Sequence, residues 1–279
     1  MKEFKNKVLV VTGAGSGIGA AIAKEGALRG MKTVLADIDG KGVENTKKEI
    51  LALGGESVAL TADVSILENV QKLHDLAMGT YGQVDFLVNN AGVAVSGPIW
   101  EIPVQDINWI TEVNLLSHAY GLRVFLPQMI RQGTPSAVVN VSSGAGLMIS
   151  PSATMYHTTK FADVALSEST FLSLKDHGFG YIQMHVLCPA FVRTGIHQSD
   201  LHRPERYASM GDPYYQSQEY KSGLIRSEKQ VLSGIPIDTV GMTVFTGVEE
   251  NKFYILTHPE ILIPAGQRSA NLLNGKNPS

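Results

Sequence analysis

Tyr156 and Lys160 lie four residues apart in the segment Met-Tyr-His-Thr-Thr-Lys. On a helix this spacing puts both side chains on one face, so the lysine ammonium can lie beside the phenol. A free tyrosine titrates at about pH 10, and a neighbouring cation favours its ionised form. We expect the pKa of Tyr156 to be lowered toward working pH, where a general acid/base is most effective. The pair therefore indicates proton transfer.

A glycine-rich turn lies near the beginning of the chain, where residues 12–19 read Thr-Gly-Ala-Gly-Ser-Gly-Ile-Gly. It follows an apolar run and opens an amphipathic stretch, which is the context of a dinucleotide-binding turn. Glycines let a pyrophosphate approach the backbone, and the first turn of the helix offers unpaired N–H groups and partial positive charge. If the dinucleotide carries an oxidised nicotinamide, its positive ring also favours the phenolate of Tyr156.

Asp37 follows the second apolar run, eighteen residues after Gly19. At the end of a strand its carboxylate can accept hydrogen bonds from both hydroxyls of an adenosine ribose, and it would repel a 2′-phosphate. We therefore expect NAD as the cofactor and NADP as the less favoured one. Asp39 and Asp63 are further carboxylates near this position. Aspartates of this kind are also typical of helix capping or of a solvated loop.

Composition restricts the function classes. The 279 residues carry a formal net charge of −3, which argues against a nucleic-acid-binding protein. No apolar run is long enough to span a membrane and no signal region opens the chain, so we expect a cytoplasmic protein. The single cysteine, Cys188, excludes an internal disulfide and is typical of a small buried apolar residue. The histidines show no metal-ligand spacing, so no metal site is predicted.

Apolar, β-branched runs alternate with amphipathic stretches along most of the chain, a pattern typical of strand–helix units feeding a parallel sheet. The fold class predicted is α/β: a doubly wound, mostly parallel Rossmann sheet of seven strands in a single domain spanning residues 1–265. Strands are expected at residues 8–11, 33–36, 57–60, 86–88, 137–141, 182–187 and 253–256. Helices are expected at residues 18–29, 43–53, 67–81, 106–131 and 154–175.

The alternation stops after Pro189. Residues 190–235 are irregular in pattern and rich in tyrosine, and strand-like sequence returns only after them. A loop of this length in a compact domain is usually functional, so we interpret it as a lid over a substrate. Among its charged residues lie Tyr207, Met210, Tyr214, Tyr215, Tyr220 and Leu224. Residues 266–279 are predicted to form a flexible tail.

Taken together, the ordered motifs make the sequence resemble the short-chain dehydrogenase/reductase family over roughly residues 5–194. Several motifs in one order carry the resemblance. The glycine-rich turn belongs to the same pattern, since its spacing is T-G-x-x-x-G-x-G rather than G-x-G-x-x-G. The motifs are T-G-x-x-x-G-x-G at residues 12–19, Asp63-Val64, N-N-A-G at residues 89–92, Asn114, Ser143, Y-x-x-x-K at residues 156–160 and P-x-x-V-x-T at residues 189–194.

The resemblance implies four catalytic residues. Ser143 holds the substrate oxygen, Tyr156 donates or accepts the proton, and Lys160 binds the nicotinamide ribose and supports the phenolate. Asn114 positions a water that links Lys160 to solvent. His157 is adjacent to the tyrosine, but neighbouring helical residues face different directions, so we expect it on the helix surface or at an interface.

The resemblance also implies the cofactor contacts. Asp63 and Val64 flank the adenine, the segment after the fourth strand lines the riboses, and Val192 with Thr194 contacts the carboxamide. The full predicted set is Gly13, Ser16, Gly17, Ile18, Gly19, Asp37, Asp63, Val64, Asn90, Ala91, Gly92, Tyr156, Lys160, Pro189, Val192 and Thr194. Ala190 replaces the usual glycine after Pro189, which puts the turn geometry there in question.

The implied activity is NAD(P)-dependent interconversion of a secondary alcohol and a ketone. The tyrosine-rich lid suggests a bulky apolar substrate such as a hydroxysteroid, and Arg193, Arg203, Arg206 and Arg226 suggest an acidic group on it. An epimerase or dehydratase of the same fold, or a non-catalytic NAD-responsive binding protein, remains open as an alternative. Family resemblance further implies a homodimer or homotetramer in which the helices at 106–131 and 154–175 pair across subunits, with no membrane partner. The family's usual C-terminal D-G-G is absent, so its tetramer contacts are in question.

Overall fold

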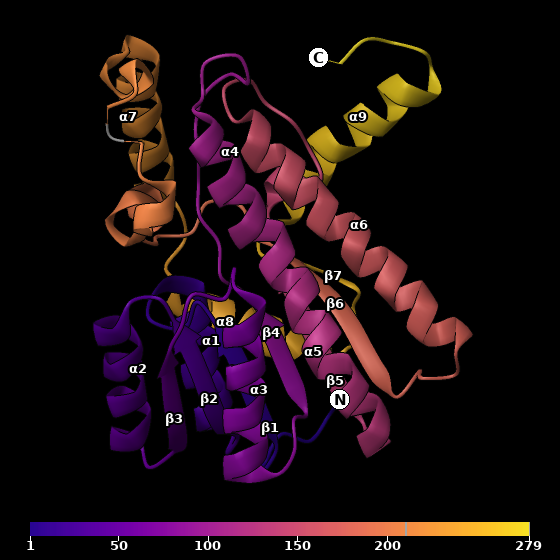
Figure 1. Ribbon diagram of the computed structural model, residues 1–279. Coiled ribbons are helices and arrows are strands. Elements are labelled where there is room, and N and C mark those ends of the chain that lie inside the picture. Colours follow the sequence, from indigo (N-terminus) through magenta and orange to yellow (C-terminus); the bar gives the residue numbers. More distant parts are fainter. Residues whose placement is uncertain (210, 279) are drawn as a thin grey trace.

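The computed structural model describes residues 1–209 and 211–278, so Met210 of the lid and Ser279 of the tail lie outside the described residues. The fold is a seven-stranded parallel sheet of order β3-β2-β1-β4-β5-β6-β7, with helices on both faces (Figure 1). The predicted fold class is confirmed. The strands are β1 Val8–Thr12, β2 Lys32–Asp37, β3 Glu56–Thr61, β4 Phe86–Asn89, β5 Ser136–Val141, β6 Ile182–Cys188 and β7 Tyr254–Leu256.

Side chains of β1 alternate between two hydrophobic cores because successive strand residues point to opposite faces. Leu9 and Val11 pack with the helices of one face, α1 Gly17–Leu28, α2 Gly40–Ala52 and α8 Asp238–Glu249. Val8 and Val10 pack with the helices of the other, α3 Leu67–Tyr81, α5 Ser117–Gln132 and α6 Thr154–Asp176. Both faces of the sheet are therefore covered, which explains why apolar residues occupy both faces of its strands.

The long helix predicted at residues 106–131 is interrupted in the middle. It consists of α4 Val104–Thr111, a π-helical turn η1 Glu112–Leu116 and α5. A π-turn inside an α-helix shifts the register of the side chains that follow and often marks a functional site. Asn114, one of the predicted site residues, lies inside this turn and is fully buried.

The lid segment, residues 190–235, is not the irregular loop that its sequence pattern predicts. It contains α7 Gln218–Leu232 and three short 3₁₀ helices, η3 Ile196–His202, η4 Glu205–Tyr207 and η5 Pro213–Gln216. Ser217 begins α7 by accepting a hydrogen bond from the Tyr220 N–H (3.1 Å), an N-cap signal present in the sequence. In Figure 1 these elements rise beside α4, above the carboxyl ends of the strands.

The tail is also more regular than predicted. Residues 262–273 form α9 Leu262–Leu273, so the expectation of a flexible tail from residue 266 is wrong for its first half. Alanine, leucine, glutamine and arginine favour a helix here. The Arg268 guanidinium lies over the ring of Phe161 in α6, 4.7 Å from its centroid. Figure 1 shows α9 extending away from the sheet past the start of α6.

Candidate active site

The predicted site residues gather at the carboxyl ends of the parallel strands. The turn after β1, Asp37 at the end of β2, and the segments after β3, β4, β5 and β6 all reach this edge. The strand order reverses between β1 and β4, and ligands of open α/β sheets bind in the crevice at such a switch point. Residues far apart in sequence are therefore brought to one crevice.

Two glycines allow the turn after β1 to close on the segment after β4. Gly13 has a φ of +63°, and a Cβ there would lie 2.8 Å from Ala91 Cα. A Cβ on Gly19 would lie 2.2 Å from the Gly13 carbonyl oxygen. The Asn90 amide fixes this approach by donating to the carbonyls of Thr12 and Gly13, each at 2.9 Å. A side chain at either glycine would disrupt the turn.

The beginning of α1 is open to a phosphate. Ser16 is the N-cap residue, it is exposed, and its hydroxyl makes no capping hydrogen bond. Gly17 begins the helix with a φ of +56°, and Ile18 and Gly19 follow in its first turn. Free N–H groups and the dipole of α1 therefore face the crevice with the Ser16 hydroxyl, a donor set that suits the pyrophosphate of a dinucleotide.

Asp37 is held by two backbone N–H groups. Gly15 donates to its Oδ2 at 2.7 Å and Asp39 donates to its Oδ1 at 2.8 Å. Burial raises the pKa of this carboxyl, and the two hydrogen bonds act in the opposite direction. The carboxylate is thus oriented at the end of β2, next to the glycine-rich turn. Asp39 itself caps α2 by accepting from the Lys41 N–H at 3.0 Å, the alternative role considered from the sequence.

Asp63 is tied to the lid, a contact that no sequence pattern suggests. Its carboxylate accepts hydrogen bonds from the N–H and hydroxyl of Ser65 at 3.0 and 2.6 Å. Arg206 in η4 forms an ion pair with the other carboxylate oxygen at 2.6 Å and also donates to the Ser65 hydroxyl at 2.7 Å. Val64, the second residue predicted to flank the adenine, is buried.

Tyr156 and Lys160 lie in the first two turns of α6, as their spacing predicts. The Lys160 ammonium is buried, donates to the Val141 carbonyl at 2.8 Å and lies 5.9 Å from the centroid of the Tyr156 ring. Burial raises the pKa of the Tyr156 phenol, although a hydrogen bond with Ser143 opposes this. Among the protein's own groups, removal of water outweighs the polar contacts, and the lowering of this pKa by Lys160 together with an oxidised nicotinamide stays a prediction.

Ser143 lies at the end of β5, facing Tyr156. Its hydroxyl accepts from the Ala145 N–H at 3.1 Å and lies 3.5 Å from the Pro189 carbonyl. The preceding Ser142 points into the core and donates to the Lys160 carbonyl at 2.9 Å. Of the two serines, Ser143 is the one whose side chain is hydrogen-bonded with the Tyr156 phenol.

Asn114 joins three parts of the site. Its side-chain oxygen accepts from the Val93 N–H at 2.8 Å, and its amide donates to the Val93 carbonyl at 2.9 Å and to the Thr159 hydroxyl at 3.3 Å. A Cβ on Gly92 would lie 3.6 Å from both Asn114 Oδ1 and Lys160 Nζ. The segment formed by Asn90, Ala91 and Gly92 therefore borders Lys160. The water that the resemblance assigns to Asn114 stays a prediction.

His157 is buried, not on the helix surface as expected. The Ser150 N–H donates to its Nε2 at 3.1 Å, so that nitrogen carries no proton, and Nδ1 donates to the Ala145 carbonyl at 2.9 Å. The ring thereby ties the loop after Ser143 to α6. Adjacent helical residues do face different directions, but this loop folds back over the side on which His157 lies.

The segment after β6 completes the crevice. The Pro189 carbonyl accepts from the Gly144 N–H at 2.8 Å, and Val192 is buried and bridges to Ile235. Thr194 faces the glycine-rich turn, since a Cβ on Gly17 would lie 3.7 Å from Thr194 Cβ. Ala190, where the family has a glycine, donates its N–H to the Thr257 hydroxyl at 3.2 Å, so the turn is formed without the glycine.

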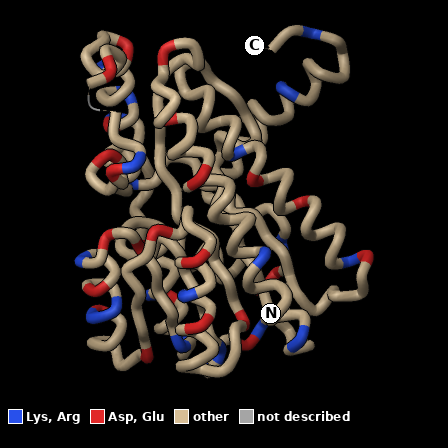
Figure 2. Tube along the Cα trace, in the orientation of Figure 1, with Lys and Arg blue, Asp and Glu red and all other residues tan. Residues whose placement is uncertain are grey.

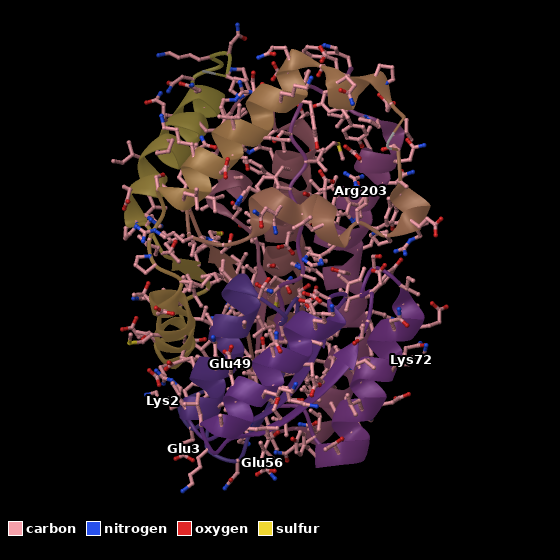
Figure 3. All side chains as sticks on the ribbon, turned by 90° about the vertical axis from the view of Figure 1, so that its left-hand side faces the viewer. Lys2, Glu3, Glu49, Glu56, Lys72 and Arg203 are labelled. Carbon is pink, nitrogen blue, oxygen red and sulfur yellow. The ribbon has the colours of Figure 1, made fainter. Side chains whose placement is uncertain are left out.

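The arginines of the lid are all paired within the protein. Arg193 donates to the Gly234 carbonyl at 3.0 Å, Arg206 pairs with Asp63, and Arg226 pairs with Glu219 at 3.0 Å. Arg203 is ion-paired with Asp106 and Asp200 and lies 4.0 Å from the centroid of the Trp109 ring. Figure 3 shows Arg203 in the upper part of the molecule, whereas the other labelled residues lie in the lower part. Three of the four lid arginines are therefore ion-paired within the protein, whereas Arg193 donates only to a backbone carbonyl.

Apolar side chains of the lid pack against the catalytic helix. Tyr207 and Tyr214 are buried in one cluster with Trp109 of α4, and Met155 and Tyr156 of α6 pack against it. Tyr214 donates its hydroxyl to the Ser96 carbonyl at 2.6 Å. The wall of the crevice around the phenol is therefore aromatic and aliphatic.

Among the described residues, no group of three histidine, cysteine, aspartate or glutamate side chains could hold a metal ion. No helix in the described part of the chain is long and apolar enough to cross a membrane. Figure 2 shows basic and acidic residues interspersed along the chain. The features left to explain are the glycine-rich turn at the start of α1 and the polar residues at the carboxyl ends of the strands.

Comparison with known proteins gives consistent results. Residues 7–205 match the family model described as short chain dehydrogenase. The chain is 44% identical over 260 residues (93% of this chain and 91% of the relative) to a CLA biosynthesis dehydrogenase/reductase of Lactiplantibacillus plantarum. It is 34% identical over 198 residues (70% and 71%) to the 1-deoxy-11-beta-hydroxypentalenate dehydrogenase of Streptomyces exfoliatus. A short chain dehydrogenase/reductase from Burkholderia phymatum, crystallised in complex with NAD, superposes with a TM-score of 0.97 at 38% identity, covering 100% of this chain and 98% of that one.

Proposed function

The chain belongs to the short chain dehydrogenase family, and on this premise we propose that it is an NAD-dependent oxidoreductase that interconverts a secondary alcohol and a ketone. One observation carries the proposal. Ser143, Tyr156 and Lys160 converge at the carboxyl edge of the sheet, beside a glycine-rich turn and helix N-terminus that suit a pyrophosphate.

Residues along the carboxyl ends of the strands suit the successive parts of a dinucleotide. The N–H groups at the start of α1 and the Ser16 hydroxyl would hold the pyrophosphate, and Asp37 would accept hydrogen bonds from the adenosine ribose. Lys160, beside Gly92, would donate to the nicotinamide ribose. When bound, the nicotinamide supplies the acceptor for the hydride of the carbinol carbon, or the donor in the reverse direction.

The side chains of this protein move the proton. In alcohol oxidation Ser143 donates a hydrogen bond to the substrate oxygen and Tyr156 accepts the hydroxyl proton as the carbonyl bond forms. In reduction the Tyr156 phenol returns that proton to the oxygen. Because burial favours the neutral phenol, the ammonium of Lys160 and the positive charge of an oxidised nicotinamide are needed to stabilise the phenolate.

A bulky apolar molecule is the substrate class that we propose. The wall beside Tyr156 is built from aromatic residues of the lid and α4, and the lid arginines are all paired internally. The related dehydrogenase of Streptomyces exfoliatus is named for a hydroxy compound, 1-deoxy-11-beta-hydroxypentalenate. Hydroxysteroids and other large secondary alcohols are therefore the first compounds to assay.

The test is a panel of secondary alcohols and ketones, from small to polycyclic, assayed by absorbance of the reduced cofactor. We expect turnover with NAD and large apolar alcohols that is lost in Ser143→Ala. A protein that binds NADH but turns over no member of the panel in either direction would instead be an NAD-responsive binding protein. Products formed without net change in the reduced cofactor would indicate an epimerase or dehydratase.

A further inference from the structure

A buried acid–imidazole pair lies one helical turn deeper than the catalytic residues. His118 follows Asn114 by four residues in α5, and Asp163 follows Lys160 by three in α6. Both side chains are completely buried, with His118 Nδ1 2.9 Å from Asp163 Oδ1. A buried pair of this kind is costly to desolvate and is weak evidence for a stabilising role. The proton transfer described above makes no use of it.

The imidazole connects α6 to the cofactor crevice. On its other side, His118 Nε2 lies 3.2 Å from the carbonyl oxygen of Ala91, in the segment predicted to line the riboses. Both neighbours of the ring are hydrogen-bond acceptors, so the imidazole bridges the Asp163 carboxylate and the Ala91 carbonyl. The ring therefore fixes the distance between the Asp163 carboxylate and the segment that borders Lys160.

The contact with His118 involves only one of the two oxygens of the Asp163 carboxylate. Asp163 Oδ2 is buried and has no hydrogen-bond partner among the described residues. Burial lowers the pKa of Lys160, and the negative charge of Asp163 acts in the opposite direction. The titratable groups facing Lys160 are Tyr156 and Asp163 on its own helix, His118 through Asp163, and the Cys188 thiol of β6, whose pKa burial raises to about 12.

We propose that Asp163, oriented by His118, is a positioning residue that keeps the Lys160 side chain in its ammonium form inside the buried site. The inference rests on the proposed function, in which that ammonium binds the nicotinamide ribose. A neutral Lys160 side chain would lack the positive charge that supports the Tyr156 phenolate. It would also have one N–H donor fewer than the ammonium. The cofactor should then bind well only below the pH at which Lys160 loses its proton.

The experiment measures NADH affinity by fluorescence titration from neutral to alkaline pH. Asp163→Asn keeps the shape of the side chain and removes its charge. We expect the alkaline midpoint of NADH affinity to move to lower pH by about one unit, a shift typical of losing one nearby charge. Above that midpoint the affinity should fall about tenfold for each pH unit.

Asp85→Asn is the matched control. Asp85 is also buried and accepts from the Val8 N–H at 2.8 Å. It directly precedes β4 and therefore lies at the amino ends of the strands, opposite the ends that carry the predicted site. The alkaline midpoint of NADH affinity in the Asp85→Asn variant should equal that of the wild type. An equal shift in Asp85→Asn would overturn the inference, because it would mark a general effect of lost stability.

Removing one member of a buried pair can prevent folding, so a second variant replaces both. His118→Leu with Asp163→Leu leaves no unpaired charge, and apolar replacement of a buried ion pair is often neutral for stability. It should show the same downward shift. Wild-type midpoints in the folded variants would refute the role of Asp163 while leaving the proposed function intact. Failure of the wild type to bind NADH would refute the proposed function itself, and this inference with it.

Discussion

Tyr156 illustrates how single residues in this site depend on their surroundings. The half-buried phenol has a raised pKa because removal of water outweighs its hydrogen bond with Ser143. Lys160 is a buried cation whose ammonium is already bonded to the Val141 carbonyl. A raised pKa means that the phenolate is the scarcer form at neutral pH, so the rate of alcohol oxidation should rise as pH increases toward that pKa.

Replacement of Tyr156 by phenylalanine removes only the hydroxyl. Turnover should fall by about 10²–10⁴, the usual contribution of a general acid/base, while NADH affinity stays close to that of the wild type. The oxidation rate and the fluorescence titration are measured on the same preparation. Near-normal turnover in this variant would show that another group moves the proton.

Asp37 determines the choice of cofactor in our interpretation. Its oriented carboxylate suits two ribose hydroxyls, whereas a 2′-phosphate would face a second anion, with Ser16 and Ile38 offering no cation. Charge-assisted hydrogen bonds contribute roughly 1.5–3 kcal/mol, so NAD should be favoured about ten- to a hundredfold. Asp37→Ala combined with Ile38→Arg should narrow or reverse this ratio of kcat/KM. A wild-type enzyme faster with NADP would contradict the assignment.

At the scale of elements, the strands and the first helices were predictable because burial on both faces leaves continuous apolar runs. The helices after residue 215 were not predictable from the sequence. α8 is rich in valine, threonine and glycine and looks strand-like, yet it forms because it packs closely on α1. A Cβ on Gly241 would lie 2.8 Å from the Ala21 carbonyl. Tertiary contact of this kind overrides local propensity and leaves no periodic signal.

The same limit applies to the site. Ser143, Tyr156 and Lys160 could be placed from spacing alone, because one strand end and one helix carry them. The direction of the pKa of Tyr156, the burial of His157 and the pairing of Arg206 with Asp63 depend on how loops fold over these elements. Sequence distance contains no information about such contacts.

The pairing of Arg206 with Asp63 fixes η4 of the lid against the predicted adenine site. Arg206 is 40% exposed in its side chain, and ion pairs of this exposure contribute about 0–1 kcal/mol. Arg206→Ala should therefore weaken NAD binding by up to about fivefold, because the lid loses its anchor at the adenine end. Arg226→Ala, which removes a similar pair with Glu219 within α7, should leave the affinity unchanged. Equal effects in both variants, measured by titration, would argue against the anchor.

At the scale of the whole molecule, the sheet determines where both halves of the reaction meet. The switch point between β1 and β4 places the crevice centrally, and α5 and α6 cover one face beside it (Figure 1). The elements that rise above the strand ends, α4, α7 and the start of α6, supply the apolar wall around Tyr156. In the proposed function, cofactor recognition belongs to the carboxyl ends of the strands and substrate recognition to the elements above them.

Assembly is the last prediction. Helix α6 leaves Leu172 61% exposed on a helix that family resemblance places between subunits, so we expect a homo-oligomer in which α5 and α6 pair with their copies. Leu172→Glu would put a charge into that apolar contact and should shift the protein toward monomer. Leu51→Glu changes an apolar residue of α2 that is 48% exposed, and should leave the assembly intact. The measurement is light scattering at micromolar concentration. A wild type that is only monomeric, or a Leu172→Glu variant of unchanged mass, would refute this pairing, and a shift in both variants would show that any added charge disrupts the assembly.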